Sequence, residues 1–102
     1  MHLVQILLPV FDNGGQRFPD AHYAAVRREM TGRFGGVTAY VRSPATGLWQ
    51  REDGSVERDD MVMVEVMVDS LDEEWWRGYR LALERQFAQD AIVVRAIAIR
   101  TL

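Results

Sequence analysis

The stretch from Met61 to Val68 constrains the fold most, because small apolar and larger side chains alternate along it without interruption. Side chains of a β-strand point to opposite faces in turn. One face of this strand therefore carries only valine, and the other carries Met61, Met63, Glu65 and Met67. The valine face predicts a strand covered by other elements. The opposite face is too apolar to suit water as its partner.

Other segments have the short, β-branched composition of strands and end at turn residues. They are residues 2–11, which stop at Asp12-Asn13-Gly14-Gly15, residues 37–42 and residues 91–100. Residues 48–58 favour a protruding hairpin, because Asp53-Gly54 suits a tight turn between its two arms. The chain therefore contains four main strands and one added hairpin.

Two segments between these strands have the spacing of helices with one apolar stripe. The first begins at Pro19-Asp20, and Gly35-Gly36 is expected to end it, since glycine tolerates a positive φ. Ser70 and Glu73 are expected to form a capping box at the start of the second. The stripe of this second helix consists of Trp76, Tyr79, Leu83 and Phe87.

The order of these elements predicts an α+β fold, a ferredoxin-like β-α-β-β-α-β sandwich with the hairpin inserted between strands 2 and 3. In this arrangement both helices cover one face of a four-stranded antiparallel sheet. Residues 1–102 show no linker and no repeat, so they are expected to form a single domain. A core in a chain of this length has a small margin of stability, which dimerisation would increase.

The two faces of the predicted sheet differ in composition. The set expected under the helices is purely apolar, and it includes Val4, Ile6, Leu8, Ile92, Val94, Ala96 and Ala98. The other set mixes its polar residues with leucine, methionine, valine and isoleucine. A continuous exposed apolar area usually marks an interaction surface, and a two-fold symmetric copy is the commonest partner. We therefore expect a homodimer that packs sheet against sheet.

Polar residues of the uncovered face fall on neighbouring strands if the strand order is 4-1-3-2. The predicted ligand-binding residues on this face are Gln5, Tyr40, Arg42, Met63, Glu65, Met67 and Arg95. Two interpretations remain open for their charged groups. Glu65 and an arginine could form a structural ion pair at the dimer interface, or the face could hold a small-ligand pocket with the methionines as adaptable walls.

Glu65 and His22 are the candidate catalytic residues, should the chain be an enzyme. A carboxylate buried between two arginines has its charged form favoured, whereas one in an apolar pocket has a raised pKa and can act as a general acid or base. His22 lies in the first turn of the first helix, where it could transfer protons near neutral pH. A surface histidine without a catalytic role is the plainer interpretation of this position.

Composition excludes several classes of chemistry. The chain has no cysteine, and all 12 of its basic residues are arginine, so thiol nucleophiles, Schiff-base lysines and the P-loop lysine are absent. A net charge of -3 argues against nucleic-acid binding. Histidine and carboxylate spacing matches no metal-ligand pattern, and we expect neither a metal nor a cofactor. The first residues lack the basic region of a signal peptide, and no apolar run is long enough to span a membrane, so a cytoplasmic location is expected.

The middle of the sequence resembles a group of small uncharacterised bacterial proteins with a ferredoxin-like fold. The resemblance lies in Gly36-Val37-Thr38-Ala39-Tyr40, Gly47-Leu48-Trp49-Gln50, Asp53-Gly54-Ser55-Val56 and the strand Met61–Val68. The architecture is also similar to the dimeric α+β barrel superfamily, which includes antibiotic-biosynthesis-type monooxygenases, muconolactone-isomerase-like proteins and YCII-related proteins. This resemblance implies a sheet-to-sheet dimer that can enclose a cavity, and it transfers no chemistry.

From these observations we expect a homodimeric module that binds a small ligand or a protein and has no defined catalytic centre. The alternative is a cofactor-independent enzyme of the monooxygenase, isomerase or YCII-like kind, with its cavity between the sheet and the partner copy. In that alternative Glu65 or His22 moves a proton while Arg42 or Arg95 holds an anionic substrate. The sequence leaves open whether the chain is an enzyme.

Overall fold

The computed structural model describes the backbone of most of the chain and the side chains of its two outer parts. Backbone is described for residues 1–35, 38–42, 48–50, 56–58 and 61–102, and side chains for residues 1–35 and 61–102. In chain order the elements are β1 (His2–Pro9), α1 (Asp20–Phe34), β2 (Thr38–Arg42), β3 (Leu48–Gln50), β4 (Val56–Arg58), β5 (Met61–Val68), α2 (Glu73–Gln86) and β6 (Val94–Ala98). Among the described residues, no helix is long and apolar enough to cross a membrane.

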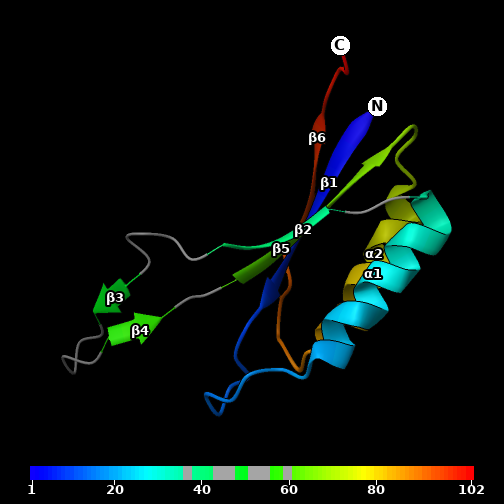
Figure 1. Cartoon of the computed structure of the whole chain (residues 1–102). Helices are drawn as coiled ribbons and strands as arrows, with labels where there is room; N and C mark the ends of the chain where they lie inside the picture. Colours follow the sequence, from blue (N-terminus) through cyan, green and yellow to red (C-terminus); the bar gives the residue numbers. More distant parts are fainter. Residues whose placement is uncertain (36–37, 43–47, 51–55, 59–60) are drawn as a thin grey trace.

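Antiparallel pairing joins β5, β1 and β6 into a sheet, and β2 pairs with the outer edge of β5. The strand order is therefore β2-β5-β1-β6. Both helices lie on the same side of this sheet (Figure 1), which confirms the α+β class. Strands β3 and β4 pair with each other as a separate two-stranded sheet, as the predicted hairpin requires, while its turn at residues 51–55 lies outside the described residues.

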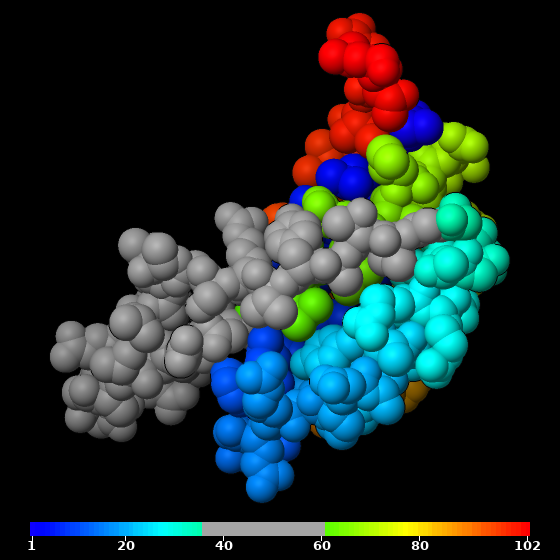
Figure 2. Space-filling view, in the orientation of Figure 1, coloured from blue at the N-terminus to red at the C-terminus, as the bar shows by residue number. Residues whose placement is uncertain are grey.

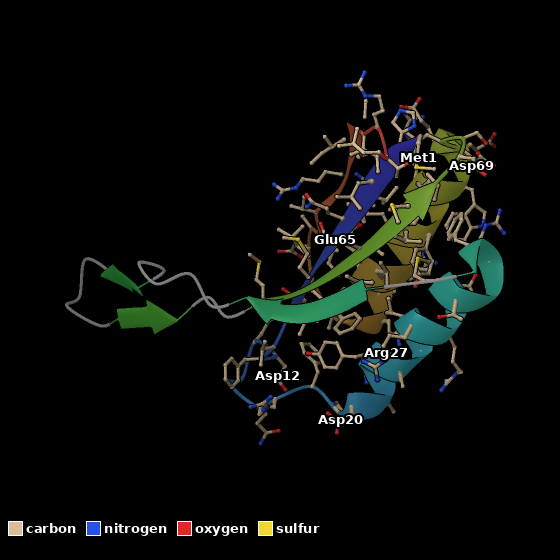
Figure 3. All side chains as sticks on the ribbon, turned by 45° about the horizontal axis from the view of Figure 1, so that its top comes forward. Met1, Asp12, Asp20, Arg27, Glu65 and Asp69 are labelled. Atoms are coloured by element: carbon tan, nitrogen blue, oxygen red, sulfur yellow. The ribbon has the colours of Figure 1, made fainter. Side chains whose placement is uncertain are left out.

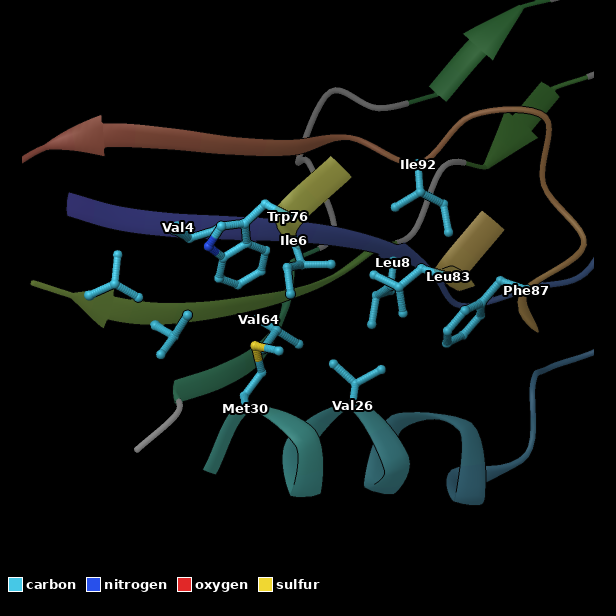
Figure 4. Packing of buried hydrophobic residues seen from close by; sticks show 12 residues of the cluster. Val4, Ile6, Leu8, Val26, Met30, Val64, Trp76, Leu83, Phe87 and Ile92 are labelled. Carbon is cyan, nitrogen blue, oxygen red and sulfur yellow. The ribbon is translucent and has the colours of Figure 1, made fainter. Parts of the chain in front are cut away.

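The core lies between the sheet and the helices, where apolar side chains from all these layers meet (Figure 4). The helix-facing side chains of β1 are almost completely buried, with Val4 1% exposed and Ile6 and Leu8 0% exposed. Helix α1 contributes Val26 and Met30, and the stripe of α2 includes Leu83. The alternation in the sequence thus correctly predicts which face of β1 and β5 the helices cover.

The helix ends agree with the sequence in one place and differ in another. Gly35 caps α1 with a φ of 80°, and its backbone N–H donates to the carbonyl oxygen of Thr31 at 2.9 Å. The predicted capping box of α2 is wrong, because the cap is Asp72, whose carboxylate accepts a hydrogen bond from the Trp75 backbone N–H at 3.1 Å. Since α2 begins at Glu73, Ser70 lies too far upstream to cap it.

Strand β6 is shorter and less covered than the sequence predicts. Ile92 and Val94 are buried or half-buried as expected, but Ala96 and Ala98 are exposed. The helices therefore leave the second half of this edge strand uncovered. Beyond β6 the last residues project from the body of the molecule (Figure 2).

Tyr79 makes the stability of this fold sensitive to high pH. Burial, with a smaller contribution from the charge of Glu29, raises the pKa of its phenol to about 12 from an ordinary value of 10.0. The neutral phenol is therefore favoured in the folded state, so its contribution is complete below about pH 10 and is lost as the pH rises through 12. We expect Tyr79→Phe to show a smaller drop in urea midpoint between about pH 8 and about pH 11 than the wild type.

The pKa of Tyr23 is also raised, again mainly by burial, so part of the alkaline sensitivity is expected to persist in Tyr79→Phe. Equal drops in the urea midpoint of wild type and Tyr79→Phe would contradict the assignment to Tyr79.

Candidate functional site

A chain of hydrogen bonds crosses three strands on the sheet face away from the helices. Arg95 Nε donates to Gln5 Oε1 at 2.7 Å, and Gln5 Nε2 donates to Glu65 Oε2 at 2.7 Å. The register places these residues directly opposite one another, with Gln5 between Glu65 of β5 and Arg95 of β6. Glu65 lies on the side of the sheet opposite to α1 (Figure 3). The convergence expected for these three polar residues is therefore observed.

The hydrogen-bonded chain fixes the orientation of both charged groups. The amide of Gln5 has one acceptor and one donor end; it uses the first for Arg95 and the second for Glu65. Bonds with one ionised partner are stronger than neutral ones, so Gln5 holds a positive and a negative group on either side of itself. Gln5 and Glu65 are half-buried and Arg95 is exposed, which leaves both charged ends accessible.

Apolar residues form a row on each side of this polar chain. One row is Ile97, Leu3 and Met67, which are paired across β6, β1 and β5. Ile97 is 47% exposed and Met67 56% exposed. The other row contains Val93, 52% exposed, and Leu7, whose backbone N–H donates to the Val93 carbonyl at 3.0 Å. The face therefore combines two fixed charges with an apolar surface around them, as small-molecule sites do.

The two methionines predicted as walls differ in accessibility. Met63 is 1% exposed. Met63 lies between two neighbouring strands, opposite Leu7 of β1 on one side and Tyr40 of β2 on the other. The described pairing of β2 with β5 ends at Glu65, so β2 does not flank Met67. Met67 is thus the accessible one of the two, and the role of both methionines in ligand binding stays a prediction.

Two further predicted ligand-binding residues lie on β2. Tyr40 pairs with Met63 and Arg42 with Met61, so the backbone of both is placed beside the open face of β5. Their side chains lie outside the described residues. Their role in binding stays a prediction.

His22 is not part of this site. Its ring packs against Phe18 and Phe87, with centroid distances of 5.5 Å and 5.3 Å. Phe87 belongs to the core on the helix side of the sheet, so His22 and Glu65 lie on different sides of it. His22 and Glu65 therefore do not share one centre, and a catalytic role for either residue stays a prediction.

A cleft of about 220 Å³ lies on the helix side of β6, where α2 leaves the strand uncovered. Its charged lining residues are Glu73, Arg77, Arg80 and Arg95, and its apolar ones are Val4, Leu71, Trp76, Val94 and Ala96. Sequence reasoning missed the arginines of α2. The signal was present, because residues 73, 77 and 80 recur at the spacing of one helix face, but that face is normally solvated.

No protein-family model and no curated protein matches this sequence. Among solved structures, the fold is similar to a phage SAM lyase in complex with S-methyl-5'-thioadenosine, with a TM-score of 0.60 and 13% identity. The similarity covers 94% of this chain and 79% of that chain. A phage SAM lyase in the apo state gives a TM-score of 0.59 at 14% identity, covering 94% and 78%.

At this level of identity the likeness shows a shared small α+β fold. The comparisons give no support to the resemblance to the dimeric α+β barrel superfamily. They also correct the expectation of a binding module without a catalytic centre, because the proteins of similar fold are enzymes. The alternative expectation, a cofactor-independent enzyme, is the better supported of the two.

Proposed function

We propose that this chain is a cofactor-independent enzyme that cleaves S-adenosylmethionine (SAM) or a closely related sulfonium nucleoside on the open face of its sheet. The observation that carries the proposal is the hydrogen-bonded chain from Arg95 through Gln5 to Glu65. The similarity in fold to a SAM lyase, which extends over 94% of this chain, gives it further support.

The charges of the site complement those of SAM. The amino-acid part of SAM ends in a carboxylate, which the guanidinium of Arg95 can bind. The sulfonium at the other end of the amino-acid part is positive. Glu65 lies on the far side of Gln5 from Arg95, so its carboxylate can attract the sulfonium while Arg95 binds the carboxylate of SAM. Adenosine then has the apolar row of Leu3, Met67 and Ile97 to lie on.

The reaction needs only a base and correct positioning. Breaking the bond between sulfur and the amino-acid chain passes the electron pair to sulfur and releases S-methyl-5'-thioadenosine as a neutral thioether. In the proposed elimination, Glu65 accepts the proton of the neighbouring carbon, and the electrons of that C–H bond form the new double bond. Atoms and charge then balance without an oxidant, a reductant or a metal.

The proposal also includes the finer structural expectations. We assign the strand order β2-β5-β1-β6 with two helices on one face to the ferredoxin-like arrangement. We further propose a homodimer in which a second copy covers the open face and closes the site from water, as in dimeric α+β barrels. We also propose that the protein is located in the cytoplasm. The exposed Met67 and Ile97 support a partner on this face.

Met67→Arg tests the dimer. Met67 is 56% exposed, so a single copy accommodates the arginine, whereas two sheets packed together would bury its charge without a partner. We expect the mass measured by light scattering to shift from dimer towards monomer. Leu81→Arg, at an exposed position of α2, is the matched control and should stay dimeric. A wild-type monomer, or a Met67→Arg dimer of unchanged affinity, would contradict this part of the proposal.

The activity is tested by incubating the purified protein with SAM and separating the products by chromatography with mass detection. We expect S-methyl-5'-thioadenosine to accumulate in proportion to enzyme concentration and above the spontaneous breakdown in buffer. S-adenosylhomocysteine, which has no sulfonium, should bind without being cleaved. A rate equal to that of buffer would contradict the proposed function.

A further inference from the structure

We infer that the cleft between α2 and β6 is a second binding site, which takes a small organic carboxylate with an apolar body. This inference goes beyond the proposed enzyme site, because Arg95 is the one residue that lines the cleft and also belongs to that site. Its lining is uncommon for a surface depression, because three arginines and one glutamate surround an apolar floor. A positive rim above an apolar floor suits an amphipathic anion.

Arg80 provides the strongest observation. Its Nε atom is buried and has no hydrogen-bond partner among the described residues. A buried donor without a partner is costly, and the great majority of such groups are satisfied in folded proteins. Arg80 lines the cleft, so a turn of its side chain towards the cleft would let a carboxylate bound there accept a hydrogen bond from this atom.

Arg77 can supply a second contact to the same anion. It lies on the same face of α2 as Arg80 and also lines the cleft. It pairs with Glu73, with 3.9 Å between Arg77 Nη2 and Glu73 Oε2, and the two side chains are 70% and 67% exposed. An ion pair this long and this exposed contributes little stability, so Arg77 is free to turn towards a ligand.

The apolar lining of the cleft determines which kind of body the carboxylate ligand has. The apolar part of the lining consists of Val4, Leu71, Trp76, Val94 and Ala96. A ligand whose apolar body covers this lining gains binding free energy from the burial of apolar surface. Acetate is too small to gain in this way. The cleft, at about 220 Å³, is smaller than most drug-sized pockets, so it fits a compact body such as a single ring or a short chain.

Benzoate is a suitable probe, and binding is measured by backbone amide shifts in ¹⁵N-labelled protein together with calorimetry. We expect saturable binding with the largest shifts at Leu71, Trp76 and Ala96, and weaker binding of acetate. Arg80→Gln should lower benzoate affinity by about tenfold or more. The matched control is Arg85→Gln, in the exposed last turn of α2, and it should leave the affinity unchanged.

Thermal unfolding of each variant checks that it is folded, and Arg80→Lys provides a second test that keeps the charge but removes Nε. We expect its affinity for benzoate to lie between those of wild type and Arg80→Gln. Unchanged affinity in both Arg80 variants, no saturable binding, or shifts centred on Gln5 and Glu65 would overturn the inference. Glu65→Gln should leave benzoate binding intact, so failure of the proposed enzyme site and failure of this site are distinguishable.

Discussion

Phe87→Ala is expected to lower the free energy of unfolding by about 3–5 kcal/mol. Phe87 is 0% exposed, and its ring contacts Phe18, His22 and Tyr23 at centroid distances of 5.0 Å, 5.3 Å and 5.6 Å. Alanine would remove the ring at the centre of this group and leave a cavity. Domains of this size are stable by about 5–15 kcal/mol in total, so the loss is a large fraction. Urea titration followed by circular dichroism measures it.

Leu81→Ala is the matched control for this substitution. Leu81 lies on α2, of which Phe87 is the C-cap residue, and it is 47% exposed, so its truncation should change the free energy of unfolding by about 0.5 kcal/mol or less. If the two variants were equally stable, the end of α2 would not be packed against α1 as the structure describes.

Glu65→Gln is expected to reduce kcat for SAM cleavage by about 10²–10⁴-fold. The amide has the shape of the carboxylate and can still accept the hydrogen bond that Gln5 Nε2 donates to Oε2 at 2.7 Å. It cannot act as a base. The fold and the binding of S-methyl-5'-thioadenosine should therefore change little while turnover is lost. Initial rates and thermal unfolding, measured on the same preparation, separate the two effects.

Asp69→Asn provides the comparison for Glu65→Gln. Asp69 follows the end of β5 and is exposed, so this substitution removes a carboxylate from the neighbouring sequence but not from the open face. We expect its kcat to equal that of wild type. Full activity in Glu65→Gln would show that another group accepts the proton.

Local patterns predicted most of the fold. Alternation along β1 and β5 depends only on strand geometry, so it identified the helix-facing residues Val4, Ile6 and Leu8. The end of α1 was predictable because the residue after a helix often has a positive φ, which Gly35 adopts. By contrast, the exposure of Ala96 depends on how far α2 extends across the sheet. The extent to which α2 covers the sheet is set by tertiary packing, and the residue pattern of a single strand carries no information about that packing.

The candidate site was predictable to the same extent. Once the strand order is assumed, register places Gln5 between Glu65 and Arg95, and the hydrogen bonds follow. The position of His22 could not be obtained in this way, because the ring packs against Phe87 from a distant helix. The cleft was missed for a related reason: Arg77 and Arg80 on a helix indicate a solvated face unless a neighbouring strand is seen beneath them.

Edge strand β6 connects the two proposed sites. Arg95 donates to Gln5 on the open face, while Val94 and Ala96 form part of the floor of the cleft. Arg95 also lines the cleft, so this one uncovered strand contributes residues to both surfaces. This arrangement follows from the incomplete cover that α2 provides.

The most direct test of the open-face site is a titration of ¹⁵N-labelled protein with S-methyl-5'-thioadenosine, followed through the backbone amides. If the site lies over the polar chain, the largest shifts will occur at Gln5, Glu65 and Arg95 and will saturate. Absence of saturable shifts, or shifts confined to Leu71, Arg77 and Arg80 of the cleft, would contradict the placement of the enzyme site on the open face of the sheet.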